Sequence, residues 1–189
     1  LRRQRQMCIR DSYGPIPIPT LEDLKNPLDE VIEPRATQEE MTNFIETELT
    51  ESLKGLPTRT TQFGRFDKGL AYTILMKYYM HEKNWAKAEE CGRELLKAEY
   101  GYGLMDRYAD IFTLENEGNK EIIFACTEER GTNLQLWHDH ALPGNYPTQN
   151  TAIQKWDGYK VPWPFYRTFE EGDDRLSFLV GEYVGTDGV

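Results

Sequence analysis

The chain has 189 residues, of which 39% are hydrophobic and 12% aromatic, so it can bury the core of one ordinary domain, and its composition shows no sign of disorder. Its formal net charge of −10 argues against nucleic-acid binding, because neutralising phosphates requires clustered Lys and Arg. No apolar run reaches the length of about 18 residues that a membrane-spanning helix needs.

Residues 1–12 differ in composition from the rest of the chain. They hold four Arg and two Gln but only one Asp, and their apolar residues follow no helical or strand period. The run resembles a translated sequencing adaptor, so we expect a non-native leader that contributes nothing to the fold. Without it, residues 13–189 carry a net charge of −13 and contain no cluster of Lys and Arg. Nucleic acid is therefore not an expected partner.

The cysteines outside the leader are too few and too far apart to form a disulfide framework. Cys91 lies in a helical pattern and Cys126 lies in an apolar run. Small, buried, apolar thiols are the commoner outcome for such residues, and we favour it for both. A Cys91–Cys126 disulfide is the alternative that the sequence leaves open.

The first helix is predicted over Thr37–Lys54. Before it, residues 13–36 contain five prolines and predict an irregular wrapping segment, with one short helical turn around Leu21–Lys25. Thr37 and Glu40 have the spacing of a capping box, in which each side chain satisfies the other residue's free amide. Gly55 and Pro57 are expected to end the helix.

Two further helices are predicted over Asp67–His81, with Asp67 as N-cap, and over Asn84–Ala98. The connection between them is only a few residues long, so we expect an antiparallel hairpin whose interface includes Tyr79 and Ala88. The pair resembles a tetratricopeptide helix hairpin, in which a small residue occupies the closest approach. The side chains expected to face inward from the last helix are Trp85, Ala88, Cys91, Leu95 and Leu96.

After Tyr100 the pattern changes from helical to irregular. A short amphipathic turn is predicted over Arg107–Phe112, and the apolar run Glu121–Cys126 predicts a buried strand, because it is short and rich in β-branched and aromatic residues. Residues 131–164 form a long, aromatic, loop-rich segment, and such segments are usually functional. The predicted fold class is therefore mainly α, with a helical part at about 37–112 and a loop-rich part at about 113–189.

Several short landmarks occur in a fixed order between residues 13 and 175. They are Tyr13-Gly14-Pro15-Ile16-Pro17; Arg35-Ala36-Thr37 before Phe44-Ile45, Leu49 and Leu56-Pro57; Gly64-Arg65 before Gly69-Leu70-Ala71; the hairpin up to Ala88; Tyr100 with Leu104, Tyr108 and Phe112; Glu121-Ile122-Ile123-Phe124; Trp156-Asp157-Gly158; and Phe169-Glu170-Glu171 before Asp173-Asp174-Arg175. In this order they resemble the SusD/RagB family, and the resemblance covers nearly all of the chain outside the leader.

The resemblance implies a fold, a location and a function. It implies tetratricopeptide-like helix pairs with an irregular ligand-facing region, lipid-anchored at the outer membrane on the cell surface. The implied partner is a SusC-like TonB-dependent transporter, to which such proteins deliver oligosaccharides or, in some branches, peptides. Because family members are longer and begin with a lipoprotein signal, we expect this chain to be an internal fragment that lacks the anchor.

For a glycan receiver, we predict that Trp137, Asp139, Asn145 and Tyr146 contribute to binding. Aromatic rings offer flat, partly apolar faces for the C–H face of a sugar, and nearby carboxylate and amide groups can hydrogen-bond its hydroxyls. The alternative is that Trp137 or Tyr146 packs in the core. Trp156-Asp157-Gly158 is interpreted as a turn that defines the fold, and Trp163, between two prolines, as a packed wedge before a short helix.

Catalysis is not expected. His138 and His140 are spaced two apart on an irregular segment without a third ligand, which is a weak metal signal. The carboxylates between Glu170 and Asp174 are typical of a solvated helix end, whereas a glycosidase needs one desolvated carboxyl across a cleft from another. The sequence also lacks a nucleophile elbow and a phosphate-binding glycine loop. We therefore expect no enzyme, no cofactor and no metal.

Two functional hypotheses remain. The first is an oligosaccharide-binding protein that works with a membrane transporter by stacking and hydrogen bonding. The second is a helical-repeat scaffold that recognises a protein and has no small-molecule site. The helix hairpin is compatible with both, while the aromatic segment 131–164 favours the first.

Overall fold

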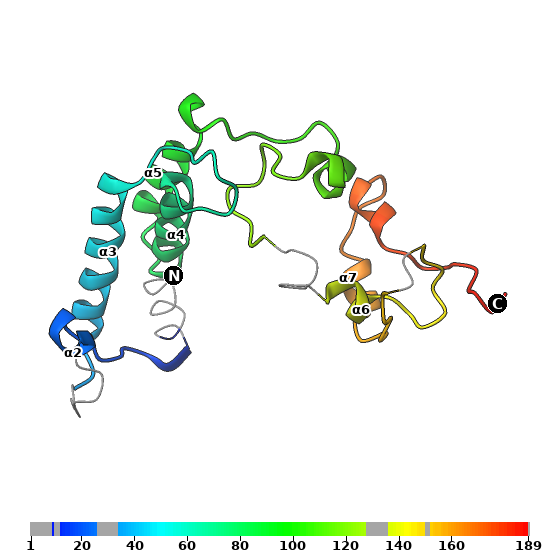
Figure 1. Cartoon of the computed structure of the whole chain (residues 1–189), viewed down its shortest axis with the longest axis horizontal. Helices are drawn as coiled ribbons and strands as arrows, with labels where there is room; N and C mark the ends of the chain where they lie inside the picture. Colours follow the sequence, from blue (N-terminus) through cyan, green and yellow to red (C-terminus); the bar gives the residue numbers. More distant parts are fainter. Residues whose placement is uncertain (1–8, 10–11, 26–33, 128–135, 150–151, 189) are drawn as a thin grey trace. The chain divides into compact units, whose positions relative to one another are not determined.

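The computed structural model describes residues 9, 12–25, 34–127, 136–149 and 152–188, which are mainly helical (Figure 1). The chain divides into two compact units, one of residues 1–104 and 120–125 and the other of residues 105–119 and 126–189. Most of the expected leader, residues 1–12, lies outside the described residues. Within the described ranges, no helix is long and apolar enough to cross a membrane.

The first unit begins with the two predicted helical segments. Helix α2 covers Leu21–Lys25, and α3 covers Gln38–Gly55. At the start of α3, Glu40 N–H donates to Thr37 Oγ1 at 3.2 Å, and Thr37 N–H donates to the Glu40 carboxylate at 2.7 Å. The predicted capping box is therefore confirmed, and it satisfies amides that have no partner inside the helix.

Helices α4, Lys68–His81, and α5, Trp85–Leu95, form the predicted antiparallel hairpin, and α4 also packs on α3 (Figure 1). Asp67 caps α4 by accepting from Leu70 N–H at 3.0 Å, and Asn84 caps α5. Tyr79 and Ala88 are both buried in the shared core, as predicted. A small residue at position 88 lets the two helices approach closely.

The turn of the hairpin places a lysine in a left-handed conformation. Lys83 has φ of 58°, a region that favours glycine. Its N–H donates to Met80 O at 3.1 Å, and Asn84 N–H donates to Tyr79 O at 2.8 Å. These two bonds are those of a Schellman motif, which satisfies the last carbonyls of α4 and reverses the chain into α5.

Two details of the third predicted helix are wrong. Helix α5 ends at Leu95, and Ala98–Tyr100 form a separate 3-10 turn, η1, so Leu96 leaves the helical period and is exposed. Trp85 is also exposed instead of inward-facing. Because helical side chains lean toward the N-terminus, a ring at the first position of α5 projects past the hairpin turn instead of onto α4.

The core of the first unit lies where α3, α4 and α5 meet. Its buried members are Met41, Ile45, Leu49, Leu75, Tyr78, Tyr79, Ala88 and Cys91. Ile16 and Ile18 of the proline-rich segment pack on this cluster from outside. Arg35 holds that segment in place by donating to Tyr13 O at 3.0 Å. The described parts of the segment before α3 therefore pack on the helices, as predicted, and residues 26–33 of it lie outside the described residues.

The predicted strand Glu121–Cys126 does not form, and the described residues contain no strand. The segment is held by side-chain packing, with the rings of Phe66 and Phe124 5.5 Å apart. A strand requires a neighbouring extended segment for its amides and carbonyls, and apolar composition alone does not supply one. Cys91 and Cys126 are free thiols, and only Cys91 is buried, so the expected burial of Cys126 is wrong.

The second unit is built from short helical segments. They are η2, Tyr108–Phe112; η3, Leu114–Asn116; α6, Trp137–Ala141; α7, Trp163–Tyr166; and η4, Asp174–Phe178. The rings of Tyr108, Phe112 and Phe178 pack edge to face, with centroids 5.2–5.7 Å apart, and join η2 to η4. Trp163 opens α7 as expected, but its ring is exposed and is not a packed wedge.

Candidate functional site

Helix α6 presents one exposed ring and one buried carboxylate. Trp137 is 59% exposed, whereas Asp139 is only 7% exposed. Residues two apart on a helix point to opposite sides, so these two predicted site residues cannot face the same ligand from α6. Trp137 is directed to solvent, and Asp139 is directed into the unit.

A return segment, residues 154–159, lies against the end of α6 and is bonded to it through the main chain. Gln154 N–H donates to the Asp139 carboxylate, and Trp156 N–H donates to Asp139 O. Further along, Gly158 and Tyr159 both donate to His140 O, at 2.7 Å and 3.0 Å. These bonds hold the segment on α6, but the backbone of residues 153–160 contains no turn, so the turn predicted at Trp156-Asp157-Gly158 does not form.

This arrangement brings four rings into a continuous series, which we call the aromatic row: Trp137, Tyr159, His140 and Trp156. Trp137 and Tyr159 are stacked, with centroids 5.0 Å apart and planes 28° from parallel. His140 lies 5.2 Å from Tyr159 and 4.8 Å from Trp156. Tyr159 is 51% exposed, so the stacked pair is accessible to a ligand.

The geometry of the stacked pair decides where a ligand can bind. A sugar between two rings needs van der Waals contact on both of its faces, about 3.5–4 Å each, so the rings would have to be about 7–8 Å apart. The 5.0 Å between Trp137 and Tyr159 is too small for that. A flat, partly apolar ligand would therefore stack on an outer face of the pair.

Asn145 and Tyr146 lie in a second cluster, with the C-terminal segment. Asn145 donates to the Asp187 carboxylate at 3.1 Å and accepts from Tyr183 Oη at 2.6 Å. The half-buried Tyr146 ring lies 4.9 Å from the Tyr183 ring. The polar atoms and the ring that we predicted for sugar binding are thus engaged within the unit, and the structure pairs Trp137 with Tyr159 instead of with these residues.

Sequence reasoning missed Tyr159 and the role of the His140 ring. In the sequence, His140 belongs only to a weak metal signal, and Tyr159 lies in the aromatic segment 131–164 without a pattern of its own. Main-chain hydrogen bonds between segments far apart in the chain bring the two rings together, and no local pattern encodes these bonds.

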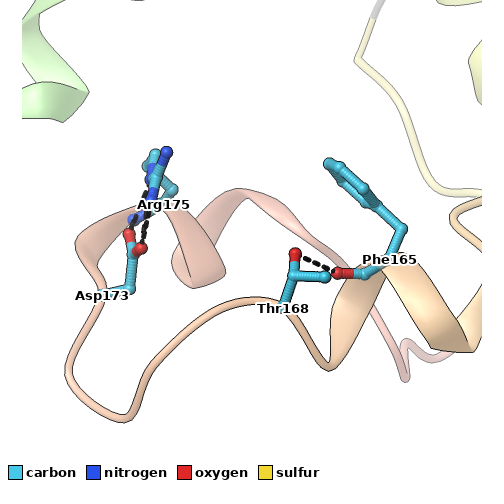
Figure 2. Close-up of polar contacts among 4 residues, drawn as sticks. All are labelled: Phe165, Thr168, Asp173 and Arg175. Carbon is cyan, nitrogen blue, oxygen red and sulfur yellow. Dashed lines mark hydrogen bonds and ion pairs between the residues drawn. The ribbon is translucent and has the colours of Figure 1, made fainter.

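The carboxylates near residue 173 line a cavity of about 340 Å³. Figure 2 shows Asp173 and Arg175 facing each other in a two-point ion pair, with Thr168 Oγ1 donating to Phe165 O at 2.7 Å. The hydrogen bonds from Arg175 lower the pKa of Asp173 to about 2. A general acid needs a raised pKa, so the Asp173 carboxyl has the opposite property. It also caps η4 by accepting from Arg175 N–H.

Among the described residues, the structure does not place the two histidines of α6 in a group of possible metal ligands. In the part of the chain that the structure describes, no group of three or more His, Cys, Asp and Glu side chains is placed to hold a metal ion. The His140 ring instead lies against Tyr159 and Trp156.

Comparison with known proteins gives no assignment. No protein-family model matches the chain, and no curated protein or solved structure is similar enough to count as a match.

Proposed function

We propose that this chain carries an oligosaccharide-binding surface centred on Trp137 and Tyr159, and that it belongs to a SusD/RagB-type nutrient-binding protein. The observation that carries the proposal is the pair of stacked, half-exposed rings on α6 and its return segment. The ordered landmarks between residues 13 and 175 support the family, and the α4–α5 hairpin is compatible with its tetratricopeptide-like helix pairs.

Stacked aromatic pairs are suited to carbohydrate. The C–H face of a pyranose is flat and apolar, and it gains contact area on an indole or phenol ring at little entropic cost to the protein, since Trp and Tyr have only two rotatable side-chain bonds. Stacking on Tyr159 restrains the Trp137 ring before a ligand arrives, which reduces the ordering cost of binding. Binding requires no chemical step in this mechanism.

In the full proposal, the protein is lipid-anchored on the cell-surface face of the outer membrane. It receives the oligosaccharide from outside and delivers it to a SusC-like TonB-dependent transporter. The net charge of −13 over residues 13–189 suits neutral sugars better than anionic ones, because an acidic surface repels polyanions.

The test is affinity gel electrophoresis of the 189-residue chain in gels that contain soluble glucans, xylan, mannan or fructan. For a retarding polysaccharide, Trp137→Ala and Tyr159→Ala should each weaken binding roughly 5- to 150-fold, the equivalent of about 1–3 kcal/mol for loss of one stacked ring. Trp85→Ala and Trp163→Ala are matched controls, because these rings are 62% and 69% exposed but lie outside the aromatic row.

The outcomes separate the hypotheses. Unchanged retardation in the Trp137→Ala/Tyr159→Ala double variant contradicts a glycan site at this pair. Peptide cargo is tested by calorimetry with a tryptic peptide mixture, and Trp137-dependent binding of peptide without polysaccharide would replace glycan as the ligand class. A chain that binds neither probe but binds a protein through the α4–α5 hairpin would instead be the helical scaffold, whose binding Trp85→Ala is expected to weaken.

A further inference from the structure

We infer that Asp139 is a positioning residue, whose side chain and main chain hold the return segment 154–159 on α6 and thereby place Tyr159 against Trp137. The importance of this placement for ligand binding rests on the proposed function. The geometric claim itself stands on the contacts of α6 and does not depend on any ligand.

The first support is the use that the structure makes of the Asp139 carboxylate. The side chain is 7% exposed, so it is withdrawn from ligand and solvent, and it accepts from the main-chain N–H of Gln154. A buried carboxylate is unfavourable without such a partner. The hydrogen bond therefore ties the return segment to α6 at Gln154 and helps to fix its register.

The second support is the backbone of the return segment. Lys155 and Asp157 both have φ of 57°, a conformation that side-chain-bearing residues rarely adopt. Two such residues so close together relax unless surrounding contacts hold them. Asp139 O accepts from Trp156 N–H, which lies between them, and Leu142 O accepts from Asp157 N–H at 3.0 Å. The carboxylate and the carbonyl of Asp139 thus accept hydrogen bonds from Gln154 and Trp156, the residues on either side of Lys155.

The third support is the position of Tyr159, which ends the return segment. Tyr159 N–H donates to His140 O at 3.0 Å, one residue after Asp139, and its ring stacks on Trp137 at 5.0 Å. If the segment slips relative to α6, Tyr159 moves with it and the pair separates. Removing the carboxylate acceptor at position 139 should therefore separate the rings of Tyr159 and Trp137, although the Asp139 side chain contacts neither ring.

The test reads the ring pair without any ligand, from the indole ¹H–¹⁵N resonances of the four Trp residues in the labelled 189-residue chain. Each resonance is assigned from its loss in the corresponding Trp→Phe spectrum. Tyr159→Leu defines the Trp137 position when the stacked ring and its ring current are absent. Asp139→Leu should move the Trp137 resonance to that same position, whereas Asp139→Asn, which keeps an oxygen acceptor, should leave it near the wild-type position.

Trp163 is the internal control, and Glu171→Leu, which removes an exposed carboxylate of the same unit, is the matched variant. A Trp137 resonance that stays in place in folded Asp139→Leu overturns the inference. If Asp139→Leu also displaces the Trp163 resonance, Asp139→Asn decides: a retained Trp137 position supports the inference, and a displaced one overturns it.

Polysaccharide binding by the same variants separates this inference from the proposed function. With a binding polysaccharide, Asp139→Leu should lose affinity by the same factor as Tyr159→Leu, and Asp139→Asn should retain it. If the wild-type chain binds none of the polysaccharides, the proposed function fails, and the indole spectra alone decide the role of Asp139.

Discussion

The hydroxyl of Tyr79 in α4 donates a hydrogen bond of 2.8 Å to Oε1 of Glu46 in α3. Lys87 of α5 forms an ion pair with the same oxygen, and its ammonium lies 5.1 Å from the centre of the Tyr79 ring. One carboxylate therefore joins all three helices at the edge of the core. Burial and the hydrogen bond to Glu46 raise the pKa of Tyr79.

The contacts of Glu46 with Tyr79 and Lys87 predict that the stability of the chain depends on pH. Burial raises the pKa of Glu46, but the hydrogen bonds from Lys87 and Tyr79 and the charge of Lys87 outweigh it, so the pKa is lowered overall. Because the pKa of Glu46 is lower in the folded chain than in the unfolded chain, its ionised carboxylate stabilises the fold. This stabilisation is complete above the unfolded-state pKa of about 4.3 and is lost as the pH falls through the folded-state pKa.

Glu46→Gln should therefore lower the free energy of unfolding by about 0.5–1.5 kcal/mol at pH 7, the contribution of one hydrogen bond. The difference from wild type should shrink as the pH falls below about 4.3. Urea unfolding at a series of pH values measures it, and a difference that is constant across that range would show that the charge of Glu46 is not involved. Glu39→Gln, at an exposed position on the same helix, is the control.

Ala88 tests the closeness of α4 and α5. Because Ala88 is buried in the core shared with Tyr79, Ala88→Leu should lower the free energy of unfolding by roughly 1–3 kcal/mol through overpacking. Ala86→Leu, an exposed position on the same helix, should change it by less than about 0.5 kcal/mol. Equal effects of the two substitutions in urea unfolding would contradict the packing described for the hairpin.

Gly69 lies against the hydroxyl of Tyr102. A Cβ at position 69 would be 2.0 Å from Tyr102 Oη, so Gly69→Ala should destabilise the first unit by roughly 1–3 kcal/mol. Gly92→Ala should instead stabilise it by about 0.5–1 kcal/mol, because that helical glycine has ordinary contact distance to Met76. In a Tyr102→Ala background the cost of Gly69→Ala should largely disappear, and a double-mutant cycle without coupling would refute the clash.

Lys83 should be the position where glycine stabilises the chain. Its left-handed conformation carries a cost of about 1 kcal/mol that glycine does not have, so Lys83→Gly should raise the midpoint of thermal unfolding. Lys77→Gly, at an exposed position inside α4, should lower the free energy of unfolding by about 1 kcal/mol. If both substitutions destabilise the chain, the Schellman turn is not formed in solution.

Local signals in the sequence were sufficient for the helices of the first unit. The capping box of Thr37 and Glu40 and the cap at Asp67 act within three or four residues, so their meaning does not depend on the rest of the chain. The buried positions Ala88 and Cys91 also follow from helical period, because one face of a helix must meet its neighbour. These features were predictable for that reason.

Tertiary structure decided which residues are buried, which segments pair and which rings meet, where the hydrophobic period of the sequence left these points open. Trp85 has the spacing of an inward residue, but its place at the first turn of α5 directs the ring past the hairpin. The run Glu121–Cys126 has strand composition, but it pairs with no other strand in the part of the chain that the structure describes. In the second unit, the sequence marked Trp137 as a candidate contact, while the partner ring came from Tyr159, 22 positions away. Such pairings arise from main-chain hydrogen bonds between distant segments, and no periodicity within either segment encodes them.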